Sequence, residues 1–217
     1  MMQRSKQTVA IILDFDGTIA DTFLMALNVF YELSHREPMP EEDITRLRGM
    51  GNRELMRELD IHVWQLPFWG WRARRKLAAQ IDDVELIPGM ADAIRKLARQ
   101  YQLFVLSSNS SNNVAAVLKR YCVSDLFAGV YGNAGVLHKE RRLRRLLRQN
   151  HIEPTMAWYV GDEVRDIAAG HHEGMRVMSV SWGFNAIGAL QHHHPDALVF
   201  SPDELVDYFR QKRTKVE

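Results

Sequence analysis

The sequence lacks the features expected of a secreted or membrane-bound protein. Cys122 is the only cysteine among 217 residues, which excludes an internal disulfide and predicts a reducing, cytoplasmic location. No apolar stretch approaches the roughly 20 residues that a membrane-spanning helix needs. The first residues lead directly into an acidic segment without a small-residue cleavage site, so we expect no signal peptide.

Neither sign of charge is in excess. The 28 Lys and Arg residues are balanced by 27 Asp and Glu residues, so bulk charge favours neither nucleic acid nor a membrane surface as a partner. The arginine-rich stretch KERRLRRLLRQ, residues 139–149, carries leucines at helical spacing, which predicts an amphipathic helix and not a nucleic-acid-binding segment. Cys122 has no base beside it and is expected to be a small, partly buried side chain.

The sequence does contain a series of short, strongly apolar segments. Each is rich in Val, Ile, Leu or aromatic residues, as in strands that are buried on both faces of a parallel sheet. These segments are 9–13, 103–106, 157–160, 176–180 and 197–200. Helical spacing between them, as in residues 90–100, 112–121 and 139–149, predicts an α/β fold with a doubly wound parallel sheet. A final helix is predicted to begin at Ser201-Pro202, with Glu204 completing a capping box.

Residues 20–86 interrupt this alternation. They contain helical patterns but no convincing buried strand, and the segment Leu86-Ile87-Pro88-Gly89-Met90 restarts the alternation. We therefore predict an α/β core made of residues 1–19 and 87–217, with a helical domain inserted over residues 20–86.

Polar residues follow three of the predicted strands where each one ends. The first strand ends in DFDGT (14–18), the second in SSN (107–109), and the third in GDE (161–163), with Asp166 one helical turn further on. The carboxyl ends of parallel strands meet at one edge of the sheet, where such folds bind their ligands. The spacing therefore predicts a common site.

Asp14, Asp16, Asp162 and Asp166 would share this site. Two unit charges 4 Å apart repel by about 4 kcal/mol at an effective dielectric constant near 20, so the acids would be partly protonated or would bind a cation. Hard oxygen ligands without Cys or well-placed His favour Mg²⁺ over zinc. Because Mg²⁺ completes its coordination with water and phosphate oxygens, the acids also suggest a phosphorylated substrate.

These residues resemble a known family. DFDGTIADT is similar to the first motif, D-x-D-G-T, of phosphotransferases in the haloacid dehalogenase-like (HAD) superfamily, and GDEVRD (161–166) is similar to its acidic fourth motif. Ser107 and Lys139 stand where the family carries its second and third motifs. The insertion, closed by Pro-Gly-Met, resembles the helical cap of the phosphoglycolate phosphatase-like branch. The resemblance implies a Rossmann-like HAD core with a cap domain over residues 20–86.

The resemblance implies a Mg²⁺-dependent phosphatase for a small phosphomonoester, with phosphoglycolate as the leading substrate. Asp14 would be the nucleophile that forms an aspartyl-phosphate, and Asp16 would be the general acid and base. Lys139 would neutralise the charge of the phosphoryl group. The implied metal ligands are Asp14, the backbone carbonyl of Asp16, and Asp162, with Asp166 either a further ligand or a residue that orients one.

Other residues would hold the substrate. Ser107 and backbone N–H groups of the first loop would contact the phosphoryl oxygens, with Gly17 allowing the backbone to approach closely and Thr18 buttressing the loop. Ser108 and Asn109 are alternatives to Ser107, since the strand could end one residue later.

Three further basic residues enter the prediction. Lys119 and Arg141 are alternatives to Lys139, and Arg53 in the insertion is a candidate substrate contact.

Two other functions compete with the phosphatase. A sugar phosphomutase of the same branch would return the phosphoryl group to a sugar hydroxyl. A regulatory protein could bind phosphate without turnover. A dehalogenase is disfavoured, because halide departure does not need the acid that Asp16 supplies. The sequence predicts no oligomeric state.

Overall fold

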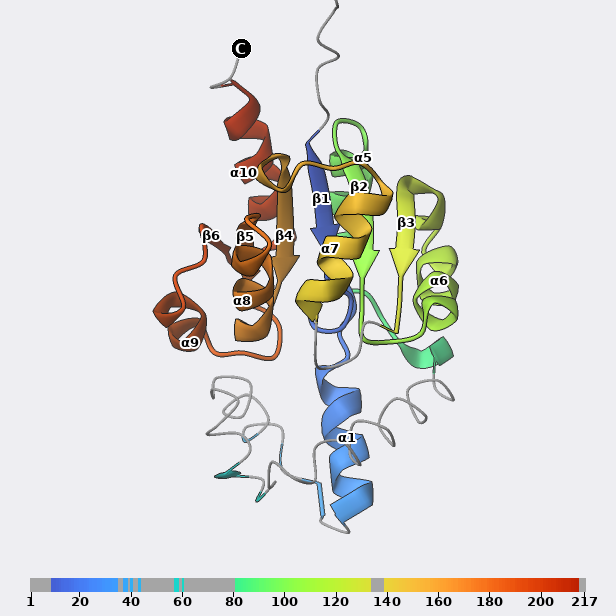
Figure 1. The fold of residues 1–217 in the computed structure, drawn as a ribbon. Coiled ribbons are helices and arrows are strands. Elements are labelled where there is room, and N and C mark those ends of the chain that lie inside the picture. Colours follow the sequence, from blue (N-terminus) through green and yellow to red (C-terminus); the bar gives the residue numbers. More distant parts are fainter. Residues whose placement is uncertain are drawn as a thin grey trace, which may run out of the picture.

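A six-stranded parallel sheet forms the centre of the fold (Figure 1). The computed structural model describes residues 9–34, 81–133 and 139–214, with the isolated positions 37–38, 40, 43, 57–58 and 60. The strands lie in the order β3-β2-β1-β4-β5-β6 and all neighbouring pairs are parallel. Their bounds are β1 Ala10–Leu13, β2 Gln102–Leu106, β3 Phe127–Tyr131, β4 Ala157–Gly161, β5 Arg176–Val180 and β6 Ala197–Val199.

Helices cover both faces of the sheet (Figure 1). One face packs against α5 (Met90–Ala98), α6 (Ser111–Arg120) and α10 (Pro202–Thr214), and the other against α7 (Lys139–Gln149) and α8 (Val164–His172), with α9 (Ile187–His192) beside α8. Side chains alternate accordingly: in β1, Ile11 and Leu13 join the first core, while Ala10 and Ile12 join the second. Short 3₁₀ turns occur at Ile81–Asp83, Ser124–Leu126 and Pro154–Met156. No helix within the described ranges combines the length and apolar character of a membrane span.

This architecture confirms the predicted doubly wound α/β fold and contains all five predicted strands. The prediction missed β3. The segment FAGVY lies at the edge of the sheet, its residues are half-buried or exposed, and Gly129 interrupts the apolar pattern. A strand with one uncovered side does not show the continuous apolar run that marks the central strands.

Two local predictions were wrong in detail. Ser201 accepts a hydrogen bond from the Glu204 N–H, as an N-cap should, but the Glu204 carboxylate accepts from the N–H of Phe200 instead of closing a capping box on Ser201. Cys122 is exposed, not partly buried, because it occupies a left-handed position (φ 54°) directly after α6.

The chain leaves and re-enters the core at two adjacent points. Ala20 and Leu86 form an antiparallel bridge, the Asp21 N–H donates to the Glu85 carbonyl at 2.9 Å, and the Ile87 N–H donates to the Ile19 carbonyl at 2.9 Å. Beyond this crossing, α1 (Phe23–Ser34) extends away from the carboxyl ends of the strands (Figure 1). Most of residues 20–86 lies outside the described residues, so the domain division stays a prediction.

The direction in which the chain adds strands to the sheet reverses at β1. The chain adds β2 and β3 on one side of β1, then crosses over to place β4, β5 and β6 on the other side. In open parallel sheets this switch leaves a crevice at the carboxyl ends of the two central strands, where ligands bind. The crevice lies beyond β1 and β4, the strands that lead into the acidic motifs.

Candidate active site

Three buried aspartates meet at the carboxyl ends of β1 and β4. Asp14 follows β1, Asp162 follows β4, and Asp166 stands in the first turn of α8. One carboxylate oxygen from each lies within 4.8 Å of the others. The Asp14 N–H donates to the Val160 carbonyl at 2.8 Å, so the β1–β4 pairing extends by one residue and fixes the start of the loop. The fold thus gathers these three acids as the sequence predicted.

Lys139 compensates part of this charge. Its ammonium lies 2.8 Å from Asp14 Oδ2 and 2.5 Å from Asp166 Oδ1, and its side chain is buried. It reaches the acids because it is the first residue of α7, at the end of this helix that lies near the carboxyl ends of the strands (Figure 1). The two alternatives considered from the sequence, Lys119 and Arg141, are both exposed.

Burial dominates the electrostatics of the cluster. Burial raises the pKa of Asp14 from 3.8 to about 7, even though Lys139 acts in the opposite direction. The pKa of Asp162 is raised well above its ordinary value, first by burial and then by the charges of Glu163, Asp166 and Asp14. Burial alone would lower the pKa of Lys139, but the charges of Asp14 and Asp166 outweigh it and raise that pKa well above 10.5.

Asp162 is fixed from two sides. Its Oδ1 accepts a hydrogen bond from the Thr18 hydroxyl at 2.7 Å, and its Oδ2 accepts one from the Phe184 N–H at 2.8 Å. Two glycines let the backbone approach this carboxylate. A Cβ on Gly17, which has a φ of 78°, would lie 2.4 Å from Asp162 Oδ2, and one on Gly183 would lie 2.2 Å from Asp162 Cβ.

Sequence reasoning missed the segment 181–185, SWGFN, that follows β5. Besides the Phe184 N–H, it contributes the Trp182 indole N–H, which donates to the Thr18 carbonyl at 3.0 Å, and Asn185 Oδ1, which accepts from the Val164 N–H at 2.8 Å. The segment contacts Asp162 itself only through the Phe184 N–H and the close approach of Gly183, and neither contact forms a recognisable sequence motif. A glycine just after a predicted strand was the available signal.

Asp166 is held at the beginning of α8. Its Oδ2 accepts from the Glu163 N–H at 3.1 Å, and its Oδ1 accepts from the Tyr159 hydroxyl at 3.3 Å as well as from Lys139. A Cβ on Gly161 would lie 2.4 Å from Asp166 Oδ2, so this residue must be glycine for Asp166 to pack there. Asp166 thus lies in the acid cluster and also orients Lys139.

The carboxylate of Asp16 lies apart from this cluster, contrary to the expectation of four converging acids. It accepts a hydrogen bond from the Ser107 hydroxyl at 3.2 Å, and Ser107 Oγ itself accepts from the Asn109 N–H at 2.9 Å. The turn after β1 explains the separation, because Asp16 pairs with Ala20 in an isolated bridge. Burial raises the pKa of Asp16, although hydrogen bonding by Ser107 and Asn109 acts in the opposite direction. Its Oδ1 is buried and has no close hydrogen-bond partner among the described residues.

The structure places the other predicted substrate contacts differently. Ser107 faces Asp16, whereas Ser108 is half-buried beside it. Asn109 is buried, but its Oδ1 accepts from the Ser110 N–H and from Asn113 at the start of α6. Arg53 lies outside the described residues.

The residues fit a hard divalent cation. Three carboxylates meet in a buried site with one lysine, so at full ionisation the cluster carries two uncompensated negative charges. Asp14 Oδ1 accepts no hydrogen bond from any described residue and is free to bind a cation. The donors are oxygens, as Mg²⁺ prefers. A buried acid cluster at the switch point of a doubly wound sheet is typical of α/β enzymes that act on anionic substrates.

Comparisons with known proteins agree with this class. The chain matches the haloacid dehalogenase-like hydrolase family over residues 11–180. A phosphoglycolate phosphatase from Synechococcus elongatus is 34% identical over 206 residues, covering 93% of this chain and 97% of that protein. Pyrophosphatase PpaX from Bacillus velezensis is 24% identical, covering 93% and 96%. A haloacid dehalogenase-like hydrolase from Streptococcus pneumoniae has the same fold, with a TM-score of 0.75 at 21% identity and coverage of 93% and 98%.

The chain therefore belongs to the haloacid dehalogenase-like hydrolase family. This confirms the family and the hydrolase class that the sequence predicted. The matched range contains every residue of the acid cluster, together with Lys139, Asp16 and Ser107.

Proposed function

We propose that the protein is a Mg²⁺-dependent phosphatase that hydrolyses a small phosphomonoester through an aspartyl-phosphate on Asp14. The observation that carries this proposal is the cluster of Asp14, Asp162 and Asp166, with Lys139 bound to two of the three acids. Bound by Asp14, the Asp16 carbonyl, Asp162 and Asp166, Mg²⁺ would neutralise charge on the phosphoryl oxygens.

The protein's own residues account for the two half-reactions. Asp14 attacks phosphorus and displaces the ester oxygen, which takes the proton of Asp16 as it leaves. The raised pKa of Asp16 favours the protonated form that this step needs. Asp16 then removes a proton from water, which attacks phosphorus, releases phosphate and regenerates Asp14. Lys139 holds Asp14 in place and offsets the repulsion between carboxylate and phosphate.

The remaining site residues are assigned to the substrate. Ser107 and backbone N–H groups of the loop after β1 would hold the phosphoryl oxygens. Gly17 lets this loop approach Asp162 closely, and Thr18 buttresses the loop, because its hydroxyl donates a hydrogen bond to Asp162. Ser108 and Asn109, which follow Ser107 after β2, are assigned to the same phosphate-binding region.

Phosphoglycolate is the leading substrate, supported by the phosphatase of that name at 34% identity. The pyrophosphatase relative makes pyrophosphate the second candidate. We assign substrate selection to a cap domain over residues 20–86, which includes Arg53. The partner is thus a small phosphorylated metabolite, and the single cysteine supports a reducing, cytoplasmic setting.

Phosphate release from phosphoglycolate, pyrophosphate and a hexose 1-phosphate should be measured with Mg²⁺ and with EDTA. We expect release from phosphoglycolate with Mg²⁺ only. Asp14→Asn should lower kcat by on the order of 10⁴-fold, while the exposed control Asp207→Asn should keep full activity. Mass spectrometry of the quenched reaction should detect a phosphoryl group on wild type and none on Asp14→Asn.

Two results would contradict the proposal. One is undiminished turnover by Asp14→Asn. The other is conversion of the hexose 1-phosphate to the 6-phosphate without free phosphate, which would identify a phosphomutase. Bound phosphate without turnover on any substrate would favour the regulatory alternative.

A further inference from the structure

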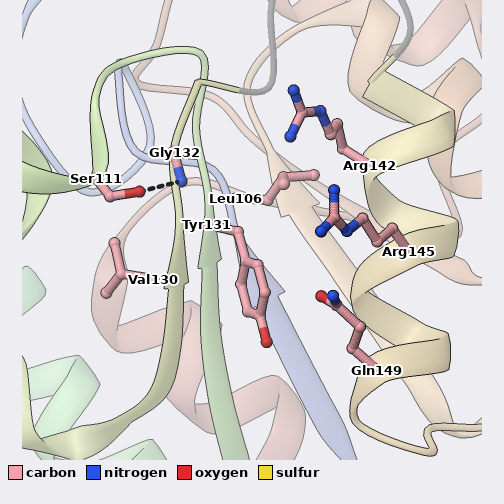
Figure 2. A pocket seen from close by; sticks show the side chains of 8 residues that line it. All are labelled: Leu106, Ser111, Val130, Tyr131, Gly132, Arg142, Arg145 and Gln149. Carbon is pink, nitrogen blue, oxygen red and sulfur yellow. Dashed lines mark hydrogen bonds between the residues drawn. The ribbon is translucent and has the colours of Figure 1, made fainter.

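A pocket lies outside the acid cluster, between α7 and the edge strand β3. It has a volume of about 230 Å³ and is open to solvent. Figure 2 shows its lining: the side chains of Arg142, Arg145 and Gln149 extend from α7 toward β3, whose Tyr131 faces them. Tyr131 of the edge strand packs with the leucines of α7, and Ser111 at the start of α6 completes the described lining.

The lining chemistry suits an anion. Hydrogen-bond donors come from five side chains, and none of the eight lining residues carries a carboxylate. The hydroxyls of Ser111 and Tyr131 accept hydrogen bonds, from the Gly132 N–H at 2.9 Å and from Asn150 at 2.8 Å, so their own protons stay available to a ligand. The Asn150 contact also fixes the position of the Tyr131 ring.

The two arginines have no structural partner among the described residues. Both are exposed, and neither forms an ion pair or a hydrogen bond with the rest of the described chain. Arg144, on the same helix, instead makes a bidentate pair with Glu173, at 2.9 and 2.8 Å. Like charges one turn apart repel each other, and an anion between them would remove that cost. Arginine is the side chain best shaped to bind phosphate through two hydrogen bonds.

We propose that this pocket is an accessory site for a small phosphate-bearing molecule. It is separate from the acid cluster, because Lys139 turns its ammonium to Asp14 and Asp166 while Arg142, one turn later on α7, points into the pocket. The two sites also differ in what they require. The acid cluster repels phosphate unless a cation is bound, whereas the pocket holds no carboxylate and needs no cation. Phosphate binding in EDTA therefore distinguishes this site from the proposed active site.

The test is an NMR titration of the arginine Nε–H resonances with inorganic phosphate, in EDTA and at constant ionic strength. Arg142→Gln and Arg145→Gln assign the two pocket resonances by their loss. Arg148→Gln assigns a matched control, since Arg148 lies on the same helix, is exposed and does not line the pocket. We expect the Arg142 and Arg145 resonances to shift saturably at roughly millimolar phosphate. The Arg148 resonance should stay unchanged.

The binding variants complete the test. Arg142→Gln/Arg145→Gln should weaken phosphate binding about tenfold or more, as measured by calorimetry in EDTA, and Arg148→Gln should not. Raising the sodium chloride concentration should weaken binding through screening. The proposal is wrong if chloride reproduces the shifts, or if Arg148 shifts as much as the pocket arginines, since either result describes an ordinary solvated basic face. Because the assay contains no Mg²⁺ and no turnover, its failure would leave the phosphatase proposal untouched.

Discussion

The helix α7 carries positive charge on a buried side and on an exposed side. Lys139, at its first residue, is buried between two carboxylates, whereas Arg142 and Arg145, one and two turns later, are exposed beside an open pocket. A buried charge must have a fixed partner, because its desolvation is otherwise uncompensated. An exposed charge needs none, so it remains available to a ligand. One helix therefore carries charge that holds a site together and charge that is free to bind.

The largest loss of activity and stability is expected for a substitution of Lys139, on the buried side of α7. Lys139→Met leaves Asp14 and Asp166 without their cationic partner and should lower kcat by about 10³-fold. Breaking a buried pair should also cost about 3 to 5 kcal/mol of unfolding free energy in EDTA. Steady-state kinetics and urea unfolding measure the two losses. A variant that retains wild-type stability would show that Lys139 is not needed to compensate the acids.

Close packing around Asp162 supplies a second test of the buried site. Gly183→Ala places a Cβ 2.2 Å from Asp162 Cβ and should displace that carboxylate, whereas a Cβ on Gly188 meets nothing within 4 Å. Gly183→Ala should cost about 1 to 3 kcal/mol and weaken Mg²⁺ binding about tenfold. Gly188→Ala should be neutral or slightly stabilising, because it lies in α9. Thermal unfolding and Mg²⁺ calorimetry of the two variants measure the change in stability and in Mg²⁺ affinity. Equal losses in both variants would contradict the role given to Gly183.

The pH dependence of the buried acids should follow from the raised pKa of Asp14. Between pH 3.8 and about 7 the folded protein without cation keeps a proton that the unfolded chain has released. Its unfolding free energy should therefore fall as pH rises through that window. Mg²⁺ must displace this proton, so its affinity should rise by up to about tenfold per pH unit until about pH 7. Calorimetry at several pH values tests this, and Asp14→Asn should flatten the profile.

The smallest change in stability is expected for a substitution of Arg145, on the exposed side of α7. Arg145→Gln removes the same unit charge from the same helix as Lys139→Met, but it should change the unfolding free energy by less than about 0.5 kcal/mol. Urea unfolding of the two variants side by side measures the contrast. A loss comparable to that of Lys139→Met would mean that Arg145 has a structural role, and the distinction between the two sides of α7 would fail.

The sequence predicted the parts of the molecule whose chemistry is carried by side-chain identity and burial. Apolar runs marked β1, β2 and β4, and the polar residues at their ends marked Asp14, Ser107 and Asp162. Edge strand β3 was missed because half-burial removes that signal.

The direction in which a loop turns its side chains was beyond sequence reasoning. Asp14 and Asp16 are two residues apart, yet one carboxylate joins the acid cluster and the other turns to Ser107. The SWGFN segment was missed for a related reason, since it contacts Asp162 through a backbone N–H and a glycine. Spacing along a sequence does not reveal contacts of this kind.

The bridge between Ala20 and Leu86 has an evolutionary consequence. Paired residues on antiparallel strands lie about 4.5 to 5.5 Å apart, so the chain leaves the core and returns to it at two adjacent points, which together form a narrow stem. Lengthening, shortening or exchanging that chain changes neither end of the stem. On the proposed assignment of substrate selection to this stretch, a new substrate preference needs the replacement of only one continuous stretch of gene, while the three clustered carboxylates keep their places.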